Sequence, residues 1–341
     1  MKLLRKIFFP FVPIYYVVTW SRNKLYDLGL KKSKSYDFPV ICVGNLSVGG
    51  TGKTPMIEYL IKLLKDDQKV ATLSRGYKRQ TKGFQLANEN ATTETIGDEP
   101  FQFYNKFGNT ILVAVDADRQ NGIAELQQQN NKPDIILLDD AYQHRKVKAG
   151  FNILLTTYDN PFFNDYVLPT GNLREPRSGA KRADIIVVTK CPKALDELEK
   201  QKVVSQIKPH QNQQVFFSSI EYSEKVISAN SDIQLKNLSN FTLVTGIANS
   251  KPLVDFLNDR SLKFEHLNFK DHHGFSERDI SELNKKALIV STEKDFMRLK
   301  HYKPLNDKLF YLPIEVVIDN ETKFNKWVES FAKVKQTYCF F

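Results

Sequence analysis

A glycine-rich segment at residues 44–54 has the residue types that hold a nucleoside triphosphate. It follows an apolar run at residues 38–43 and precedes an amphipathic run that begins at Met56, so we expect a strand, a turn and then a helix. Backbone N–H groups of such a turn face the phosphates, a lysine reaches the β- and γ-phosphates, and a threonine hydroxyl can bind Mg²⁺. The alternative is a chance glycine-rich turn. The expected nucleotide-binding residues are Ser47, Val48, Gly49, Gly50, Thr51, Gly52, Lys53 and Thr54.

Two adjacent acids, Asp139 and Asp140, end the apolar run at residues 135–138. A P-loop fold places a carboxylate that serves Mg²⁺ at the end of such a strand. Neighbouring side chains at a strand end point differently, so one acid would reach the metal and the other would orient it or contact the substrate. The sequence does not say which acid does which. The simpler alternative is that these acids cap the next helix.

Asp98 lies in the segment Gly-Asp-Glu-Pro, just before a helical run that starts at Phe101. An alcohol that attacks phosphorus needs a positioned base, and a carboxylate near the γ-phosphate would serve. A helix cap is the alternative, because acids are common before helices.

His272 and His273 form a second candidate; they are adjacent and follow an expected strand. Further ligands at the spacing of a zinc site are missing there. These histidines therefore suggest either a hydrogen-bonded turn or a side chain that shares the proton of a base across a cleft.

Two basic segments suit a phosphorylated ligand: residues 74–79 follow the end of an expected strand, and residues 168–176 are a turn-rich loop. Arg75 and Arg174 could clamp phosphate or stabilise charge during transfer, although any single arginine can also be a solvated surface residue. A third segment, residues 189–192, reads Thr-Lys-Cys-Pro. A GTPase carries an aspartate at the position of Pro192, where it binds guanine. Its absence favours ATP.

The elements that must position these residues alternate between strand and helix. Short β-branched runs separated by helical stretches extend from residue 38 to about 215, which is typical of a buried parallel sheet with crossover helices. A second unit of strands and helices follows. We therefore expect an α/β protein with a mostly parallel sheet of the P-loop NTPase type, flanked by helices, and a second, smaller α/β domain. The expected division is 1–34, a segment that associates with membranes; 35–220, the P-loop kinase domain; and 221–341, the smaller domain, closing over the active site.

Charge and composition narrow the class of partner. The chain of 341 residues carries 49 basic and 39 acidic side chains, a net charge of +10, which indicates an anionic partner such as nucleic acid, acidic lipid or a phosphorylated substrate.

Residues 1–34 hold eight basic side chains and one acid. The apolar, aromatic run at residues 7–20 lacks a cleavage site, and it is too short, with two prolines, to span a bilayer as a helix. It suits the interface of an anionic leaflet; a helix packed on the core is the alternative. Three widely spaced cysteines suggest no disulfides, hence the cytoplasm.

In combination, these stretches resemble one family, tetraacyldisaccharide 4′-kinase, the lipid A 4′-kinase of Gram-negative bacteria. The similarity extends in order over roughly residues 40–300. Some positions depart from the family's usual pattern, among them Lys78, Ala141, Tyr142, Thr170 and Asn172, but the charged groups are kept. The matching stretches are 43–54, 74–77, 97–100, 139–144, 168–175, 245–248, 271–273 and 292–295.

The resemblance implies ATP and Mg²⁺, and a lipid A disaccharide precursor, a 1-phosphate, that is phosphorylated on its 4′-hydroxyl at the cytoplasmic face of the inner membrane. The enzyme would be peripheral, on an anionic membrane surface, with neither nucleic acid nor an obligate protein partner. Asp98 would be the base, paired with His272, while Asp139 and Asp140 would serve the metal and the phosphates. The matching stretches also supply five expected substrate contacts: Arg75, Tyr77, Asn172, Arg174 and Glu175. A membrane-associated P-loop ATPase switch and a soluble small-molecule kinase are the alternatives.

Overall fold

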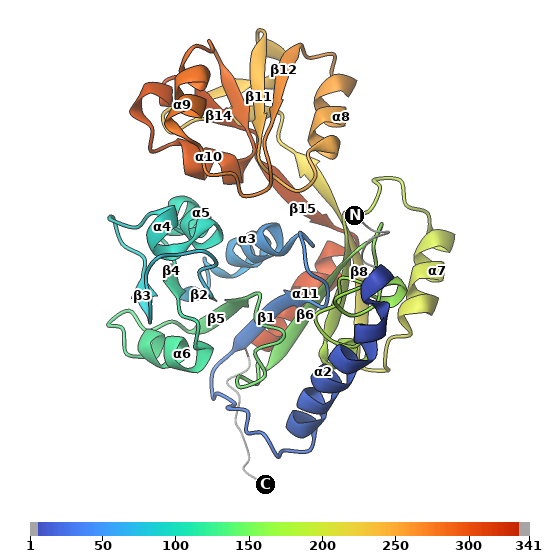
Figure 1. The fold of residues 1–341 in the computed structure, drawn as a ribbon. Coiled ribbons are helices and arrows are strands. Elements are labelled where there is room, and N and C mark those ends of the chain that lie inside the picture. Colours follow the sequence, from blue (N-terminus) through green and yellow to red (C-terminus); the bar gives the residue numbers. More distant parts are fainter. Residues whose placement is uncertain (1–5, 334–341) are drawn as a thin grey trace.

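A nine-stranded sheet forms the larger part of the computed structural model, which describes residues 6–333 (Figure 1). Its order is β15-β8-β7-β6-β1-β5-β2-β4-β3. Neighbouring strands are parallel except at the two edges, where β15 pairs with β8 and β3 pairs with β4 in antiparallel fashion. The bounds are β1 Val40–Asn45, β2 Val70–Ser74, β3 Gln85–Leu86, β4 Leu112–Val115, β5 Ile135–Asp139, β6 Phe151–Thr157, β7 Ile185–Thr189, β8 Gln214–Tyr222 and β15 Ile314–Ile318.

Helices cover both faces of this sheet, which is why its central strands are apolar on both sides. In β1, Ile41 and Val43 point into one core with α3, α5 and α11, whereas Val40 and Cys42 point into the opposite core with α6. The helix α7, by contrast, has no buried residue. The helices of the larger domain that follow β1 are α3 Lys53–Leu64, α4 Thr93–Ile96, α5 Asp98–Phe107, α6 Arg119–Gln127, α7 Glu197–Ile207 and α11 Glu321–Lys333, with short 3₁₀ turns η2 Phe162–Asn164 and η3 Arg177–Arg182.

A second, six-stranded sheet forms a smaller domain, at the top of Figure 1. Its order is β10-β9-β14-β13-β11-β12, and the last four strands are parallel. The bounds are β9 Lys225–Ile227, β10 Asp232–Gln234, β11 Phe241–Thr245, β12 Phe264–Asn268, β13 Ile289–Ser291 and β14 Leu309–Tyr311, with α8 Lys251–Asp259, α9 Glu277–Asn284, α10 Glu293–Leu299, η4 Leu235–Asn237 and η5 Lys303–Leu305.

The chain returns to the first sheet after the smaller domain. The strand β15 lies antiparallel to β8, with Ile314 opposite Tyr222, and Figure 1 shows it extending from the upper domain into the lower sheet. Phe324 and Val328 of α11 are fully buried in the core beneath β1. Residues 314–333 therefore belong to the larger domain by packing, which differs from the range 221–341 expected for the smaller one. Two adjacent strands thus join the domains.

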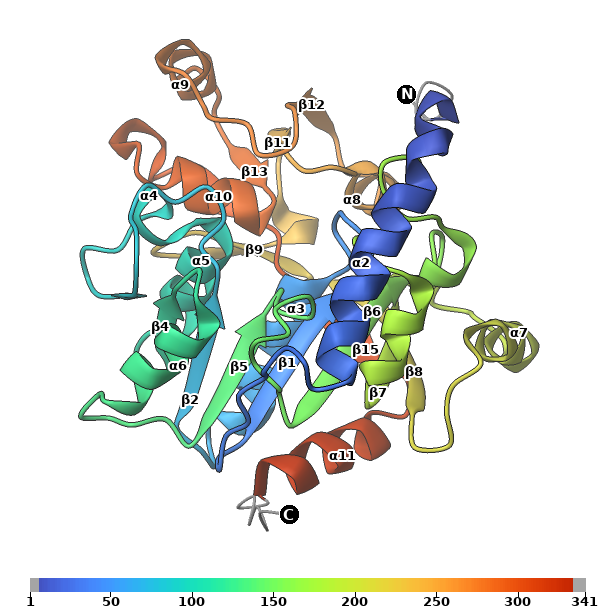
Figure 2. The ribbon, with the colours of Figure 1, turned by 60° about the horizontal axis from the view of Figure 1, so that its bottom comes forward.

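The N-terminal segment forms η1 Lys6–Phe11 and α2 Val12–Asp27. In Figure 2 this helix lies along the outside of the larger domain. Within residues 6–333, no helix combines the length and the apolar character needed to cross a bilayer. Residues 1–5 of the expected membrane segment, and residues 334–341 at the end of the second expected domain, lie outside the described part of the chain.

Candidate active site

The glycine-rich turn connects β1 to α3, as expected for a phosphate-binding loop. Gly49 and Gly52 have φ angles of +110° and +88°, a conformation in which a side chain would be strained. The side chains of Thr189, at the end of β7, and of Lys190, which follows it, hold the turn by hydrogen bonds. Thr189 Oγ1 donates to the Thr51 carbonyl (2.8 Å), and Lys190 Nζ donates to the Gly50 carbonyl (2.6 Å). Thr54 follows in the first turn of α3 and is buried. The turn is thus fixed at several points within one sheet.

The segment that contains Asn172 and Arg174 lies beside the start of this turn. Ser47 forms an antiparallel bridge with Leu173, and the Val48 N–H donates to the Asn172 carbonyl (2.7 Å). The Arg174 N–H donates in turn to the Leu46 carbonyl (2.7 Å). The structure therefore brings these two expected substrate residues against the phosphate-binding loop.

Lys53 lies among oxygen atoms at the ends of β1 and β5. Its Nζ is 3.5 Å from Asn45 Oδ1 and 3.7 Å from Asp140 Oδ1. Arg174 Nη1 contacts both oxygens of Asp140, at 2.9 and 3.1 Å. Asp140 thus pairs with two cations, and its half-buried carboxylate is shared between them.

Asp139 has a different environment from its neighbour. It is 7% exposed; Oδ2 accepts a hydrogen bond from Ser74 Oγ (3.2 Å), whereas Oδ1 is buried and has no hydrogen-bond partner among residues 6–333. Burial and the adjacent charge of Asp140 raise the pKa of Asp139 to about 6. Glu99 adds to this effect, which places the start of α5 within electrostatic reach of these acids. The two aspartates, which the sequence does not distinguish, therefore differ in the structure. Asp139 is buried with one oxygen unbonded within the described residues, whereas Asp140 forms ion pairs with Lys53 and Arg174.

A tight backbone contact links this half of the site to Asp98. Strand β2 ends at Ser74, and the segment that follows contains Gly76, which packs against Gly97. A Cβ at Gly97, where φ is +93°, would lie 3.1 Å from the Tyr77 carbonyl oxygen. Glycine is required there, and Asp98 follows as the first residue of α5.

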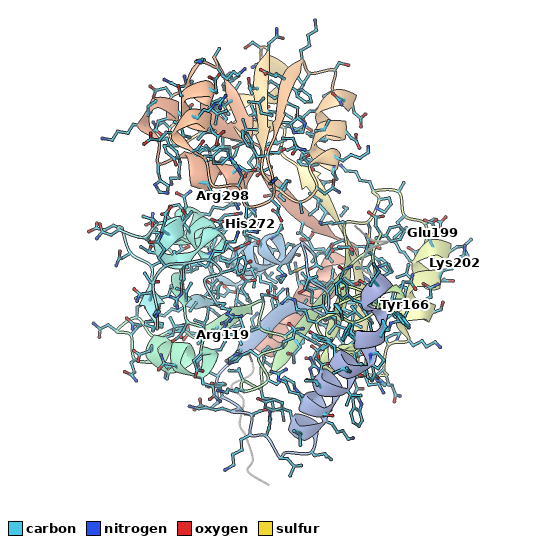
Figure 3. All side chains as sticks on the ribbon, in the orientation of Figure 1. Arg119, Tyr166, Glu199, Lys202, His272 and Arg298 are labelled. Atoms are coloured by element: carbon cyan, nitrogen blue, oxygen red, sulfur yellow. The ribbon has the colours of Figure 1, made fainter. Side chains whose placement is uncertain are left out.

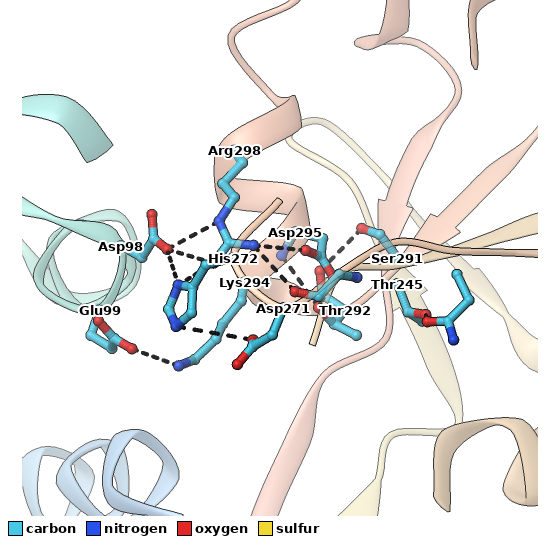
Figure 4. Close-up of polar contacts among 12 residues, drawn as sticks. Asp98, Glu99, Thr245, Asp271, His272, Ser291, Thr292, Lys294, Asp295 and Arg298 are labelled. Atoms are coloured by element: carbon cyan, nitrogen blue, oxygen red, sulfur yellow. Dashed lines mark hydrogen bonds and ion pairs between the residues drawn. The ribbon is translucent and has the colours of Figure 1, made fainter. Parts of the chain in front are cut away.

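Asp98 faces the smaller domain and pairs with two of its side chains (Figure 4). His272 Nδ1 lies 3.1 Å from Asp98 Oδ2, and Arg298 donates to the same oxygen from Nε (3.0 Å) and Nη2 (2.5 Å). Within the described part of the chain, the hydrogen bonds to the Asp98 carboxylate come from these two side chains and none comes from the backbone of α5. Although burial alone would raise the pKa of Asp98, the hydrogen bonds from His272 and Arg298 and the charge of Arg298 lower it to about 2. The carboxylate is therefore ionised throughout the physiological range.

Arg298 is itself held by a buried acid. Its Nη1 donates to Asp295 Oδ1 (3.1 Å), and Asp295 is fully buried. The other oxygen of Asp295 accepts from the Gly246 N–H (2.8 Å) and from Thr292 Oγ1 (2.6 Å). Figure 3 shows Arg298 and His272 where the upper domain meets the lower one.

Further ion pairs join the same two helices, α5 and α10. Lys294 Nζ donates to Glu99 Oε1 (2.6 Å), one residue from Asp98. Deeper in the contact, Lys106 lies between two buried acids, 2.6 Å from Glu58 and 3.0 Å from Glu293. Glu58 belongs to α3, Lys106 to α5 and Glu293 to α10. The lysine therefore links two helices of the larger domain to one helix of the smaller domain.

The adjacent histidines have separate surroundings, although the sequence does not distinguish them. His272 adopts a left-handed φ of +55°, and its ring meets that of Tyr77 at a centroid distance of 6.0 Å. His273 instead contacts Asp279 (3.0 Å) and stacks on Phe269. Only His272 of this pair faces Asp98. Tyr77 is exposed beside His272, and Arg75 is exposed two residues before Tyr77 in the sequence.

Glu175 differs from its expected place among the substrate contacts. It is 2% exposed, and both carboxylate oxygens are occupied. Oε1 accepts from Gln143 (2.9 Å) and Arg182 (2.8 Å), and Oε2 accepts from Asn23 of α2 (2.6 Å). These contacts support a different role from the expected one: the side chain anchors the N-terminal helix to the sheet, and both of its oxygens already accept hydrogen bonds.

Sequence reasoning missed Arg298, Asp295 and the Lys106 cluster. A signal for the first two was present, because an acid and an arginine three residues apart share a helix face. Nothing in the sequence indicated that this face meets Asp98, since the two residues are 200 positions apart.

Known proteins are similar to this chain over almost its whole length. The family model described as Tetraacyldisaccharide-1-P 4′-kinase matches residues 4–333. A tetraacyldisaccharide 4′-kinase of Flavobacterium johnsoniae is 51% identical over 339 residues, 98% of each chain. One of Bacteroides thetaiotaomicron is 43% identical and covers 97% of this chain and 94% of its own. The crystal structure of LpxK from Aquifex aeolicus in complex with ATP has a TM-score of 0.77 at 31% identity, covering 96% of this chain and 99% of that one. The fold class expected from the sequence is confirmed.

Proposed function

This chain belongs to the tetraacyldisaccharide-1-P 4′-kinase family, and from that premise we propose that the two halves of its site divide the reaction between them. The protein is a phosphotransferase: it uses ATP to phosphorylate the 4′-hydroxyl of a tetraacyldisaccharide 1-phosphate in lipid A biosynthesis. In our proposal the glycine-rich half binds ATP and Mg²⁺, and Asp98 with His272 receives the proton of the sugar hydroxyl. The observation that carries this division is the pairing of Asp98 with His272 across the two domains.

The residues around Asp139 fit a magnesium ion. Mg²⁺ usually takes one or two carboxylates together with phosphate oxygens and water, so three protein acids are not required. The buried Oδ1 of Asp139 has no hydrogen-bond partner, and Thr54 supplies a hydroxyl at the start of α3. We assign Asp139 and Thr54 as its ligands, with Asp140 beside them. Bound there with ATP, the ion would neutralise charge on the β- and γ-phosphates.

The protein groups then account for positioning and charge balance. Residues Ser47–Thr54 hold the triphosphate, and Lys53, now 3.7 Å from Asp140, turns its ammonium to the β- and γ-phosphates. The 4′-oxygen forms a bond to the γ-phosphorus, the bond from that phosphorus to the β,γ-bridging oxygen breaks, and ADP leaves. The hydroxyl proton goes to the Asp98 carboxylate. Tyr77, exposed beside His272, and Arg75, which is also exposed, are available to contact the sugar or its phosphate.

Mass spectrometry of the lipid product tests this function directly. A tetraacyldisaccharide 1-phosphate incubated with the protein, ATP and Mg²⁺ should gain one phosphoryl group on the 4′-oxygen. Asp98→Asn protein should form little product while still binding ATP. Release of inorganic phosphate from ATP without any phosphorylated lipid would instead support an ATPase switch. A phosphorylated soluble alcohol with no dependence on lipid would support a small-molecule kinase.

We also propose that η1 and the outer side of α2 lie on an anionic membrane surface. Among the described residues, nine of the sixteen exposed large apolar side chains fall in residues 7–20, and Ile14 and Val18 are 63% and 61% exposed. The opposite side of α2 is anchored, since Tyr15 Oη donates to the Arg174 carbonyl (2.9 Å). A membrane-bound helix would therefore sit directly against the segment beside the phosphate-binding loop. Aromatic side chains next to cations suit the headgroup region.

Co-sedimentation with vesicles of anionic phospholipid tests this placement. Replacing Ile14, Val17 and Val18 by Asn should lower the vesicle-bound fraction at least about tenfold, because three apolar side chains no longer enter the interface. Leu198→Asn is the matched control: this leucine is 69% exposed, but it lies on α7. Equal vesicle binding by the triple variant and the unmodified protein would contradict the proposal and favour a soluble enzyme.

A further inference from the structure

We propose that Arg298 is a positioning residue for the base: it holds one oxygen of Asp98, so that the other oxygen is presented to the substrate hydroxyl. This inference rests on the proposed role of Asp98 as the base. It adds a residue from the smaller domain to that role and predicts which carboxylate oxygen takes the proton.

The division of labour between the two oxygens of Asp98 is visible in the contacts. Oδ2 receives every hydrogen bond recorded for this carboxylate, from Arg298 Nε and Nη2 and from His272 Nδ1. Oδ1 receives none from the described residues, and it is not sealed in the core. A carboxylate has acceptor capacity on both oxygens, so Oδ1 is the oxygen left for an incoming hydroxyl.

Arg298 can fix this orientation because it is fixed itself. Its guanidinium spans two carboxylates, with Nη1 on Asp295 and Nε and Nη2 on Asp98. Asp295 is fully buried and bonded to the Gly246 N–H, so one end of the fork is attached to the core of the smaller domain. A planar guanidinium can hold two acids in a set direction, which a lysine ammonium cannot do to the same degree.

The same guanidinium also restricts His272. Nη2 of Arg298 lies 3.0 Å from His272 Nδ1, and that nitrogen lies 3.1 Å from Asp98 Oδ2. Nδ1 can either donate to Asp98 or accept from Arg298, but one ring nitrogen cannot do both at once. In the tautomer with the proton on Nδ1, the ring donates to Asp98 Oδ2, the same oxygen that accepts from Nε and Nη2 of Arg298. His272 and Arg298 thus converge on one oxygen.

The charges around Asp98 agree with this role. Its pKa, about 2, is held low by two groups of the smaller domain, His272 and Arg298. The other charged groups that face it, Glu99 and Asp295, are acids whose charge opposes that effect. Without Arg298 the carboxylate would turn more freely and would protonate at a higher pH.

Steady-state kinetics of Arg298→Gln, Arg298→Lys and Lys294→Gln test the inference. Lys294→Gln is the matched control, because Lys294 lies one turn away on α10 and pairs across the same domain contact with Glu99 instead of Asp98. We expect Arg298→Gln to lower kcat roughly 10–100-fold, the effect of a misplaced reacting group, with little change in KM for ATP. The acid limb of its pH profile should move to higher pH. Arg298→Lys should recover part of kcat, and guanidinium ion added to Arg298→Ala protein should restore more activity than an equal concentration of sodium ion.

Two outcomes would overturn the inference. An equal loss of kcat in Lys294→Gln and Arg298→Gln would mean that docking of the domains alone matters. An unshifted acid limb together with no rescue by lysine or guanidinium would reduce Arg298 to a structural residue. Thermal unfolding of each variant identifies loss of folding, and Arg298→Lys keeps the test valid if Arg298→Gln unfolds. If Asp98→Asn protein proves fully active, the proposed base fails, and that result is distinct from a failure of Arg298 alone.

Discussion

The half of the site that we propose for the nucleotide and the half that we propose for the base are built in different ways. Lys53, Asp139, Asp140 and Arg174 all come from one sheet and the segments that follow its strands. Asp98 belongs to that domain as well, but its partners His272 and Arg298 come from the smaller domain, 174 and 200 positions away in the sequence. One half is complete within a single domain, whereas the other exists only while two domains are in contact.

This difference implies that ATP binding and phosphoryl transfer respond separately to mutation. A triphosphate needs the glycine-rich turn and its lysine, which are held by Thr189 and Lys190 of the same sheet. The base needs the contact between α5 and α10. A protein that transfers phosphoryl to a lipid benefits from such an arrangement, because bound ATP meets an oriented base only when the domains are docked. The predictions below test each half and the contact between them.

The largest effect is expected at Asp98. Asp98→Asn keeps the shape of the side chain but removes the proton acceptor, and loss of a general base lowers kcat roughly 10²–10⁴-fold. Because the nucleotide half is independent, KM for ATP should stay within a factor of a few. Product formation on the lipid substrate, followed with radiolabelled ATP, measures both quantities. A variant that turns over at a near-normal rate would show that Asp98 only stabilises the domain contact.

The domain contact should be most sensitive at Lys106. Lys106→Met leaves Glu58 and Glu293 buried without the ammonium that bridges them, and breaking a buried ion pair costs about 3–5 kcal/mol of unfolding free energy. Urea denaturation at pH 8 measures the loss. The control is Lys62→Met: its pair with Glu315 is exposed, and it should change stability by less than about 1 kcal/mol. Equal losses in the two variants would contradict a special role for the buried cluster.

The same cluster gives the stability a defined pH dependence. Burial and the charge of Glu58 raise the pKa of Glu293 from 4.5 to about 7, although the charges of Lys106 and Lys62 lower it. Tyr311 also lies within electrostatic reach of Glu293. A raised carboxyl pKa means that the folded protein keeps a proton that the unfolded chain releases. This stabilising contribution is complete below pH 4.5 and is lost as the pH rises through about 7. Glu293→Gln should therefore flatten the fall in unfolding free energy over that interval. An unchanged slope would assign the dependence to other groups.

Lys53→Met tests the nucleotide half alone. Loss of one cation that stabilises the transferring phosphates costs roughly 10²–10³-fold in kcat, and the affinity for ATP should fall as well. The Asp98 cluster is untouched, but Lys53 opposes the rise in the pKa of Asp139 that burial and Asp140 cause, so the acid limb of the residual activity should move to higher pH. Calorimetric titration with a non-hydrolysable ATP analogue gives the affinity. Full activity in this variant would overturn the assignment of the glycine-rich turn.

The contrast between the two halves also decides what the sequence can predict. The glycine-rich turn and the strand that ends at Asp139 are local patterns, and they were predicted with nearly the observed bounds. The pairing of Asp98 with His272 came from a family resemblance, because no periodicity relates residues 174 positions apart. Arg298 was missed for the same physical reason. Its helix face could be inferred from Asp295, but what that face contacts depends on how two domains dock.

The return of the chain through β15 shows the same limit. Residues 314–318 alternate in burial, as a half-covered edge strand should, but the sequence Ile-Glu-Val-Val-Ile shows this pattern only in part, because the exposed Val317 is apolar. Pairing with β8 is a long-range event decided by which sheet edge is free. A prediction based on chain order therefore assigned these residues to the smaller domain. The buried Phe324 of α11 then completes a core that begins at Ile41.

The smallest effect is expected at Arg174, and it sharpens the comparison with Arg298. Both arginines hold an acid of the site, but the pair of Arg174 with Asp140 is partly exposed, at 26% and 34%, whereas the side chain of Arg298 is 10% exposed. An exposed ion pair is worth about 0–1 kcal/mol, so Arg174→Gln should lower kcat/KM by no more than about fivefold. Asp140 would keep Lys53 as its neighbour, at 3.7 Å. The measurement is the same lipid kinase assay, with the unmodified protein and Arg298→Gln side by side. A loss of about a hundredfold or more would mean that Arg174 leaves Asp140 when ATP binds and stabilises the transferring phosphoryl group itself. In that case the nucleotide half would contain a mobile catalytic cation, and the contrast between a half complete in one sheet and a half that forms on docking would no longer hold.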